Sequence, residues 1–308
     1  MEYSCTDITR LTTIPDIRML LIKAALKRSS YHGLEFSEIT LPSNKLYFDG
    51  FTIDPDVRKT FHKLVCWDPM SEFVHPCYLH SLAFSLHIKL LLLPEFVFPL
   101  LGLVHVSNQI RQLRPIKKTE RLIVSSCFGE LELHPKGWLF SIEVEFHSGP
   151  ELVWQSTSTN LFRTKHDCDV SPIAKSTLPS FTHPLNTTWD LSSSLGRQYA
   201  TVSGDFNPIH LTKWLAKLFG FKQHIIHGML IKSYCISSLQ KINPSLFLNA
   251  FEVNTSFRQP VYLPSEVTLS VQLYEYDSSH DEQHFKVVGK QVNLQQQPLH
   301  IIGSIISI

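Results

Sequence analysis

Apolar residues recur at helical spacing in three stretches of this chain. The spacing predicts helices over residues 13–28, 75–93 and 228–242. Apolar and β-branched runs after the second and third helices predict strands. The strand candidates cover residues 100–110, 121–128, 138–147 and 152–162 in the first half, and 251–261, 266–276, 284–294 and 300–306 in the second. Each of these two helices is thus followed by four strand candidates.

The two halves share short sequence features as well as this order. His75-Pro76 opens one helix where His227-Gly228 opens the other, and residues 112–116 resemble residues 257–261. Residues 166–186 carry three prolines and little periodicity, which is typical of a linker. We therefore predict a tandem duplication of an α+β unit: a first domain at 1–165 with a helical lead-in, a linker at 166–186 and a second domain at 187–308.

Composition narrows the class of protein. Of the 308 residues, 43% are hydrophobic and 18% charged, as in globular proteins, and 28 basic residues balance 27 acidic ones. The balance makes nucleic acid an unexpected partner. The most apolar stretch, residues 88–106, is interrupted by Lys, Glu and Pro, so no membrane span is expected. The N-terminus lacks a secretory pattern and the six cysteines form no CxxC pair, which indicates reduced thiols and a cytoplasmic protein.

Ionisable and turn-forming residues are concentrated in residues 199–210, YATVSGDFNPIH. Ser-Gly-Asp and Asn-Pro predict an irregular, rigid connection before the next helical stretch. Such a connection can aim Asp205 and His210 at one point. A carboxylate and an imidazole that converge on a water are suited to proton transfer near neutral pH.

A second feature follows at residues 225–229, IIHGM, where Gly228 begins a predicted helix. The N–H groups of a first helical turn have no partner within the helix and can bind a developing oxyanion. Glycine also allows close approach of a ligand. An acid–base pair with an oxyanion site is suited to chemistry at the carbons next to an activated carbonyl.

Residues 199–230, YATVSGDFNPIHLTKWLAKLFGFKQHIIHGML, closely resemble the hydratase 2 signature of the MaoC-like dehydratases, a family of (R)-specific enoyl-CoA hydratases and 3-hydroxyacyl-thioester dehydratases. The resemblance extends more loosely through FRQPVYLPSEVTLSV, whereas the first half has no Asp-x-Asn-Pro-x-His run. The resemblance implies a double hot dog fold, with two antiparallel sheets each wrapped around a long central helix. It also implies a pseudo-dimer within one chain, in which the first copy is degenerate; a homodimer of such chains stays open.

The resemblance also implies roles for individual residues. Asp205 and His210 would bind and activate the water, Asn207 would orient it, and Gly228 would donate its N–H to the thioester carbonyl. Around them we expect supporting or substrate contacts from Ser203, Gly204, His227 and Arg258. The substrate would be an acyl-CoA or an acyl-acyl carrier protein, and the chemistry needs no separate cofactor.

Other interpretations of the same residues remain open. Asp205, Asn207 and His210 could belong to a helix-capping turn. No HExxH motif or Cys/His ligand spacing is present, so a metal is not expected. The rival functions are a thioesterase, against which the lack of Asp and Glu in residues 228–242 argues, and an acyl-thioester binding or assembly subunit without its own activity.

Overall fold

The computed structural model describes residues 7–27, 29–31, 38–100, 102–164, 181, 184–276, 280–289 and 298–308. The chain divides into two compact units that interleave along the sequence. Unit 1 comprises Met1–Phe51, Leu82–Asn108 and Arg121–Pro179, and unit 2 comprises Thr52–Ser81, Gln109–Glu120 and Ser180–Ile308. Each is described separately below.

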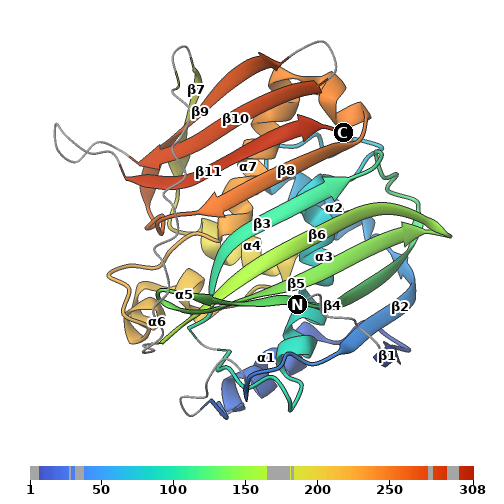
Figure 1. The fold of residues 1–308 in the computed structure, drawn as a ribbon. Helices are drawn as coiled ribbons and strands as arrows, with labels where there is room; N and C mark the ends of the chain where they lie inside the picture. Colours follow the sequence, from blue (N-terminus) through green and yellow to red (C-terminus); the bar gives the residue numbers. More distant parts are fainter. Residues whose placement is uncertain are drawn as a thin grey trace. The chain divides into compact units, whose positions relative to one another are not determined.

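Unit 2 contains the long helix α7 (Gly228–Ile242) and a sheet of five strands, β7 (Leu185–Leu191), β8 (Phe251–Phe257), β9 (Ser265–Tyr276), β10 (His280–Gly289) and β11 (Leu299–Ser307). The strands are antiparallel and lie in the order β8-β11-β10-β9-β7. Helix α7 packs along one face of this sheet (Figure 1). Along β8, buried Phe251, Val253 and Thr255 alternate with less buried residues, as expected of a strand with one face on a core.

The remaining helices of unit 2 are short. They are α2 (Pro55–Leu64), α4 (Leu195–Ser203), α5 (Pro208–Leu211), α6 (Lys213–Leu218) and the 3-10 helix η2 (Pro244–Leu248). Helices α2 and α4 contact one another. Buried Phe61 of α2 packs its ring 5.0 Å from that of Tyr78 and 6.1 Å from that of Tyr199, so α2 and α4 share an aromatic core.

Unit 1 contains α1 (Ile17–Leu26) and the strands β1 (Asp7–Arg10), β4 (Arg121–His134), β5 (Gly137–Ser148) and β6 (Glu151–Arg163). It also holds most of β2 (Asn44–Thr52) and the later turns of α3 (Pro76–Leu91). Its core is rich in aromatic rings, with Phe96 stacked on Phe128 at a centroid distance of 5.2 Å. The strand β3 (Val104–Gln112) is divided between the units at Asn108.

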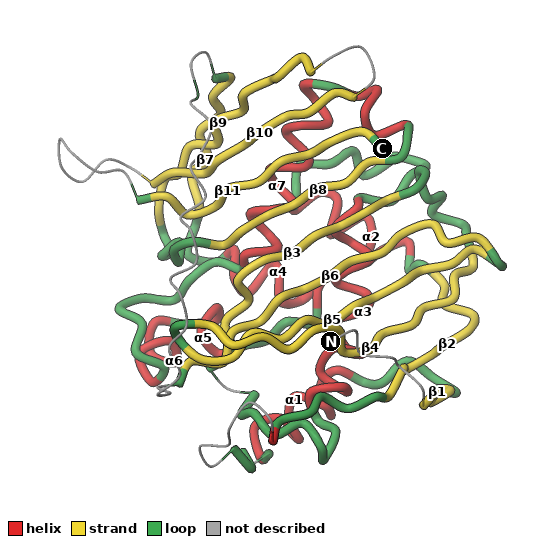
Figure 2. Tube along the Cα trace, in the orientation of Figure 1, coloured by secondary structure: helices red, strands yellow, loops and turns green. Residues whose placement is uncertain are grey.

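Strand order reveals an internal repeat. After α3 come β3, β4, β5 and β6, ordered β3-β6-β5-β4 in the sheet with β2 beyond β4. After α7 come β8, β9, β10 and β11, ordered β8-β11-β10-β9 with β7 beyond β9. The same path is thus followed twice, as the recurrence in the sequence predicts. Figure 2 shows both sets of strands in yellow.

One expectation about the sheets is wrong. Instead of two separate sheets, the strands form one hydrogen-bonded series of eleven, because β3 and β8 are neighbours in the order. A strand at a sheet edge offers unpaired N–H and C=O groups, and pairing two such edges removes both. One pairing, β1 with β2, is parallel, so the sheet is mixed.

Strongly periodic segments match their predictions, since α7 has the predicted bounds and all eight strand candidates contain a strand. Residues 88–106 hold the end of α3, a connection and the start of β3.

Within the described residues no helix is long and apolar enough to cross a membrane. Four described cysteines carry no disulfide. Cys5, Cys168 and most of the predicted linker lie outside the described residues.

The elements that were not predicted include β2, α2, β7 and α4. Strand β7 is mostly exposed and polar, so it lacks the alternation that identifies a strand. Helix α2 is polar, but a capping signal precedes it. Asp54 accepts hydrogen bonds of 2.9 Å from the N–H groups of Asp56 and Val57, and Pro55 occupies the first turn.

Candidate functional site

The loop that carries Asp205 is held by the end of α4. Gly204 ends this helix in the left-handed conformation, at φ 76°, which glycine adopts without steric cost. The Ser203 hydroxyl donates to the Tyr199 carbonyl at 2.8 Å and accepts from the Asp205 N–H at 3.2 Å. Ser203 and Gly204 therefore shape the backbone at the candidate site.

Asn207 fixes the next turn. Its side-chain oxygen accepts from the Ile209 N–H at 3.4 Å and caps α5, while its own N–H donates to the Asp205 carboxylate at 3.1 Å. The backbone of Asn207 thus orients Asp205, and its side chain serves as a cap. The contact of this side chain with water that the sequence suggests stays a prediction.

His210 is buried and turns one defined nitrogen to the site. Its Nδ1 lies 2.8 Å from the carbonyl oxygen of Ile225. Because a carbonyl can only accept, Nδ1 carries the hydrogen, and in the neutral ring Nε2 keeps a lone pair. That lone pair is the one available as a base.

His227 lies directly against His210. The two imidazole rings stack with centroids 3.8 Å apart. The ring of Tyr199, a residue of α4, has its centroid 4.8 Å from that of His227. His227 donates from Nε2 to the backbone carbonyl of Asp205 at 2.9 Å, with an Asp205 carboxylate oxygen at 3.8 Å. His227 therefore ties the start of α7 to the Asp205 loop.

Three ionisable side chains come together here: Asp205 and His210, which are the predicted acid–base pair, and His227, for which only a supporting or substrate contact is expected. Ligand-type atoms of Asp205, His210 and His227 all lie within 4.8 Å of one another. Burial raises the pKa of the Asp205 carboxyl, an effect that His210 and the Asn207 N–H oppose. Burial lowers the pKa of His210, and the Asp205 carboxylate opposes that shift. The two pKa values thus move toward each other, which favours passage of a proton between the groups.

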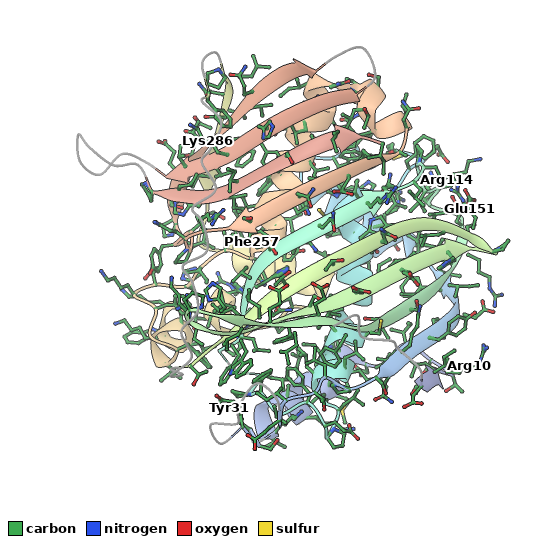
Figure 3. The ribbon with its side chains drawn as sticks, in the orientation of Figure 1. Arg10, Tyr31, Arg114, Glu151, Phe257 and Lys286 are labelled. Carbon is green, nitrogen blue, oxygen red and sulfur yellow. The ribbon has the colours of Figure 1, made fainter. Side chains whose placement is uncertain are left out.

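Gly228 stands beside this cluster as the first residue of α7, with His227 as the helix cap. Its N–H has no acceptor within the helix and is available to a ligand. A Cβ at this position would lie 2.9 Å from two ring carbons of Phe257 on β8, so only glycine fits without movement. Figure 3 labels Phe257 at the end of that strand.

Arg258 follows Phe257 directly and has an exposed side chain, while its backbone N–H donates to the His300 carbonyl at 2.8 Å. The chain thus places Arg258 near Gly228, and a contact with substrate stays a prediction.

Tyr199 contributes more than the packing predicted for it, because it also contacts His227 and lies 3.3 Å from the Ser81 hydroxyl. The position of Tyr199 as the first residue of the signature, residues 199–230, was the sequence signal that could have indicated this role.

The same three groups resemble a metal-ligand cluster by proximity alone. Each imidazole uses one nitrogen on a backbone carbonyl and keeps the other nitrogen for a proton, a water or a ligand. Such a second hydrogen bond occurs in metal-binding as well as in catalytic histidines, so the cluster fits either use.

Comparison with known proteins shows which proteins the second half resembles. Residues 178–296 match the family model described as MaoC like domain. This segment, which is less than half of the chain, is similar to the MaoC-like dehydratases. Three curated relatives agree. They are 3-hydroxyacyl-thioester dehydratase X of Mycobacterium tuberculosis (29% identity over 177 residues), the mitochondrial 3-hydroxyacyl-[acyl-carrier-protein] dehydratase of Arabidopsis thaliana (36% over 104) and (R)-specific enoyl-CoA hydratase of Aeromonas caviae (36% over 78).

These MaoC-family alignments cover 58%, 33% and 24% of this chain, and 62%, 60% and 56% of the respective relatives. The chain therefore spans less than two thirds of each relative's length.

Solved structures of the MaoC type share the fold over more of the chain. The crystal structure of HtdX from Mycobacterium tuberculosis has a TM-score of 0.69 and 23% identity, covering 85% of this chain and 98% of that one. A MaoC-like dehydratase from Phytophthora capsici has a TM-score of 0.66 and 17% identity, covering 89% and 98%. A further Mycobacterium tuberculosis protein described as having a double hot dog fold has a TM-score of 0.57 and 10% identity, covering 90% and 98%. The predicted α+β hot dog fold is thereby confirmed.

Proposed function

We propose that this chain hydrates 2-enoyl thioesters and dehydrates (R)-3-hydroxyacyl thioesters. The observation that supports the proposal is the proximity of Asp205 and His210, whose ligand-type atoms lie within 4.8 Å of one another and of His227, the residue that precedes Gly228. The curated relatives are named for reactions of these two kinds. The acyl group would be presented by coenzyme A or by acyl carrier protein, with no further cofactor.

In the hydration direction a water lies between the carboxylate of Asp205 and Nε2 of His210. The water oxygen bonds to C3 of the enoyl chain and loses one proton to this pair, while the pair returns one proton to C2. Protons therefore balance over each turnover, and dehydration is the reverse sequence. The opposite pKa shifts of the two groups make the exchange between them easy.

As water adds at C3, negative charge develops on the thioester oxygen. The Gly228 N–H and the positive end of the α7 dipole stabilise that charge. The missing side chain leaves room for the Phe257 ring, which packs against this glycine. His227 holds this helix start against the Asp205 loop.

The direct test is an absorbance assay at the enoyl-thioester band with crotonyl, octenoyl and longer coenzyme A esters, followed by chiral analysis of the product. We expect loss of the band and an (R)-3-hydroxyacyl product. Release of free thiol without hydration would support the thioesterase alternative. The absence of Asp and Glu from α7 argues against that alternative. Binding of the ester without turnover would support a binding or assembly subunit. Turnover that disappears with a chelator and returns with a metal ion would overturn the acid–base assignment.

A further inference from the structure

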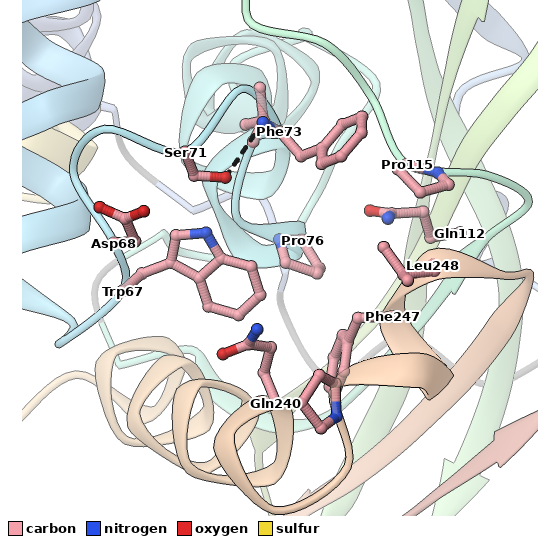
Figure 4. A pocket seen from close by; sticks show the side chains of 12 residues that line it. Trp67, Asp68, Ser71, Phe73, Pro76, Gln112, Pro115, Gln240, Phe247 and Leu248 are labelled. Atoms are coloured by element: carbon pink, nitrogen blue, oxygen red, sulfur yellow. Dashed lines mark hydrogen bonds between the residues drawn. The ribbon is translucent and has the colours of Figure 1, made fainter.

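A pocket lies at the start of α3, which corresponds to the start of α7 in the internal repeat. It has a volume of about 140 Å³, close to that of an engineered cavity that takes a benzene-sized ligand. All its lining residues belong to unit 2. They are Trp67, Asp68, Ser71, Phe73, Val74, Pro76, Gln112, Pro115, Gln240, Pro244, Phe247 and Leu248 (Figure 4).

The pocket has a buried polar group without a partner. The Gln112 side chain is 3% exposed, and its Oε1 has no hydrogen-bond partner among the described residues. Figure 4 shows the carbonyl end of Gln112 pointing toward Pro76 across the pocket. A buried unpaired acceptor costs free energy. A ligand with an N–H donor would remove that cost.

The residues that line the pocket are held in position by contacts with neighbouring residues. The Trp67 ring packs 4.8 Å from His75 and 6.0 Å from Phe247, so its orientation is fixed. Backbone hydrogen bonds of 2.9 Å, from Val74 to Ile116 and from Lys118 to Glu72, hold the rim. A preformed pocket that combines apolar walls with a few fixed polar groups is typical of small-molecule sites.

The lining also indicates what the pocket does not do. Pro76 has no N–H to offer an oxyanion, and the Cys77 N–H donates to Nδ1 of His75. Among the described residues that line the pocket there is no histidine, and Asp68 is the one charged group. The pocket is thus suited to a neutral ligand and lacks the groups for hydration.

We propose that this pocket is a second ligand site, which takes one amide-bearing segment of the neutral pantetheine arm of an acyl thioester without reacting with it. The pantetheine arm has amide N–H donors that can bind to the Gln112 carbonyl. The short aliphatic segments between these amides can pack against Trp67 and the prolines of the walls. The choice of pantetheine rests on the proposed function, whereas the pocket itself does not.

Pantetheine is the probe for the test, and the chain's five tryptophans provide the readout. In ¹H–¹⁵N spectra of the full chain, Trp67→Phe identifies the Trp67 indole signal. We expect pantetheine to shift that signal, and Gln112→Met to weaken the response about fivefold through loss of one hydrogen bond. Gln155→Met on β6, outside the pocket, should leave the response unchanged. If Gln112→Met does not fold, Leu248→Trp at the exposed rim should block binding instead.

Several results would overturn the site. They are no Trp67 shift, a shift equal in wild type and Gln112→Met, or a shift with phenol but none with pantetheine, which would indicate an apolar cavity only. The turnover assay separates the two proposals. A Gln112-dependent shift without enoyl turnover would retain this site and reject the proposed function. Enoyl turnover without a Trp67 shift would retain the proposed function and reject this site.

Discussion

At the residue scale, Asp205 and His210 lie close together within one loop and the short helix α5, and they are the acid–base pair that we propose. We expect Asp205→Asn or His210→Gln to lower turnover by about a hundredfold or more, because an acid–base group is lost while shape is kept. Steady-state kinetics and circular dichroism of the purified variants measure this.

The matched control is His75→Gln, in the position that corresponds to His227. His75 is buried and lies 3.3 Å from the Ser233 carbonyl, so the variant should unfold more easily but retain turnover per folded molecule. A loss in kcat comparable with that of His210→Gln would mean that the working half has been assigned wrongly.

Gly228 gives a second prediction at this scale. The methyl group of Gly228→Ala would meet the Phe257 ring at 2.9 Å and displace the N–H that we propose as the oxyanion donor. We expect kcat to fall about tenfold or more, as when an oxyanion donor is lost.

The double variant Gly228→Ala with Phe257→Leu makes room for the methyl group and should recover part of the rate. Equal kcat values in the single and double variants would show that contact with Phe257 is not the cause.

At the element scale, the end of α4 sets the direction of the Asp205 loop. Gly204 has φ 76° and Gly220, at the exposed end of α6, has φ 82°. Alanine is strained by about 1 kcal/mol in this conformation, so both Gly204→Ala and Gly220→Ala should lower the free energy of unfolding by that amount. Only Gly204→Ala should also reduce kcat, because only it moves Asp205. Denaturant unfolding and kinetics together test this, and unchanged kcat in Gly204→Ala would contradict it.

The elements also show where sequence patterns succeed. Helix α7 and the strands after it have strong periodicity and were predicted with nearly correct bounds. Helix α2 was missed although Asp54-Pro55 is a capping signal, because its sequence is polar and only Arg58, Phe61 and His62 are buried. Strand β7 was missed because its hydrogen bonds to β9, rather than its own residues, make it a strand.

At the scale of the whole molecule, buried histidines should make the fold sensitive to acid. Burial lowers the pKa of both His62 and His87 from 6.5 to about 4. The unfolded chain binds protons at pH 5 that the folded chain does not, so stability is lost as pH falls below about 6.5. Each group should cost on the order of 2 kcal/mol between pH 7 and pH 4.5.

His87 is the cleaner test, since burial alone lowers its pKa. In denaturant unfolding measured from pH 7 to pH 4.5, His87→Leu should lose less stability than the wild type. Parallel pH curves for the two proteins would contradict the prediction.

The sequence alone determined the strongly periodic helices and strands, the repeated order of these elements and the candidate site loop, because these depend on periodicity and turn chemistry that neighbouring residues carry. The spacing of Asp205, Asn207, His210 and Gly228 also predicted the resemblance to the MaoC-like dehydratases, whose family model matches residues 178–296. The tertiary structure decided the continuous strand series, the stacking of His227 on His210 and the unpaired Gln112 carbonyl. These depend on contacts between residues far apart in the chain, and no local pattern encodes which distant groups meet.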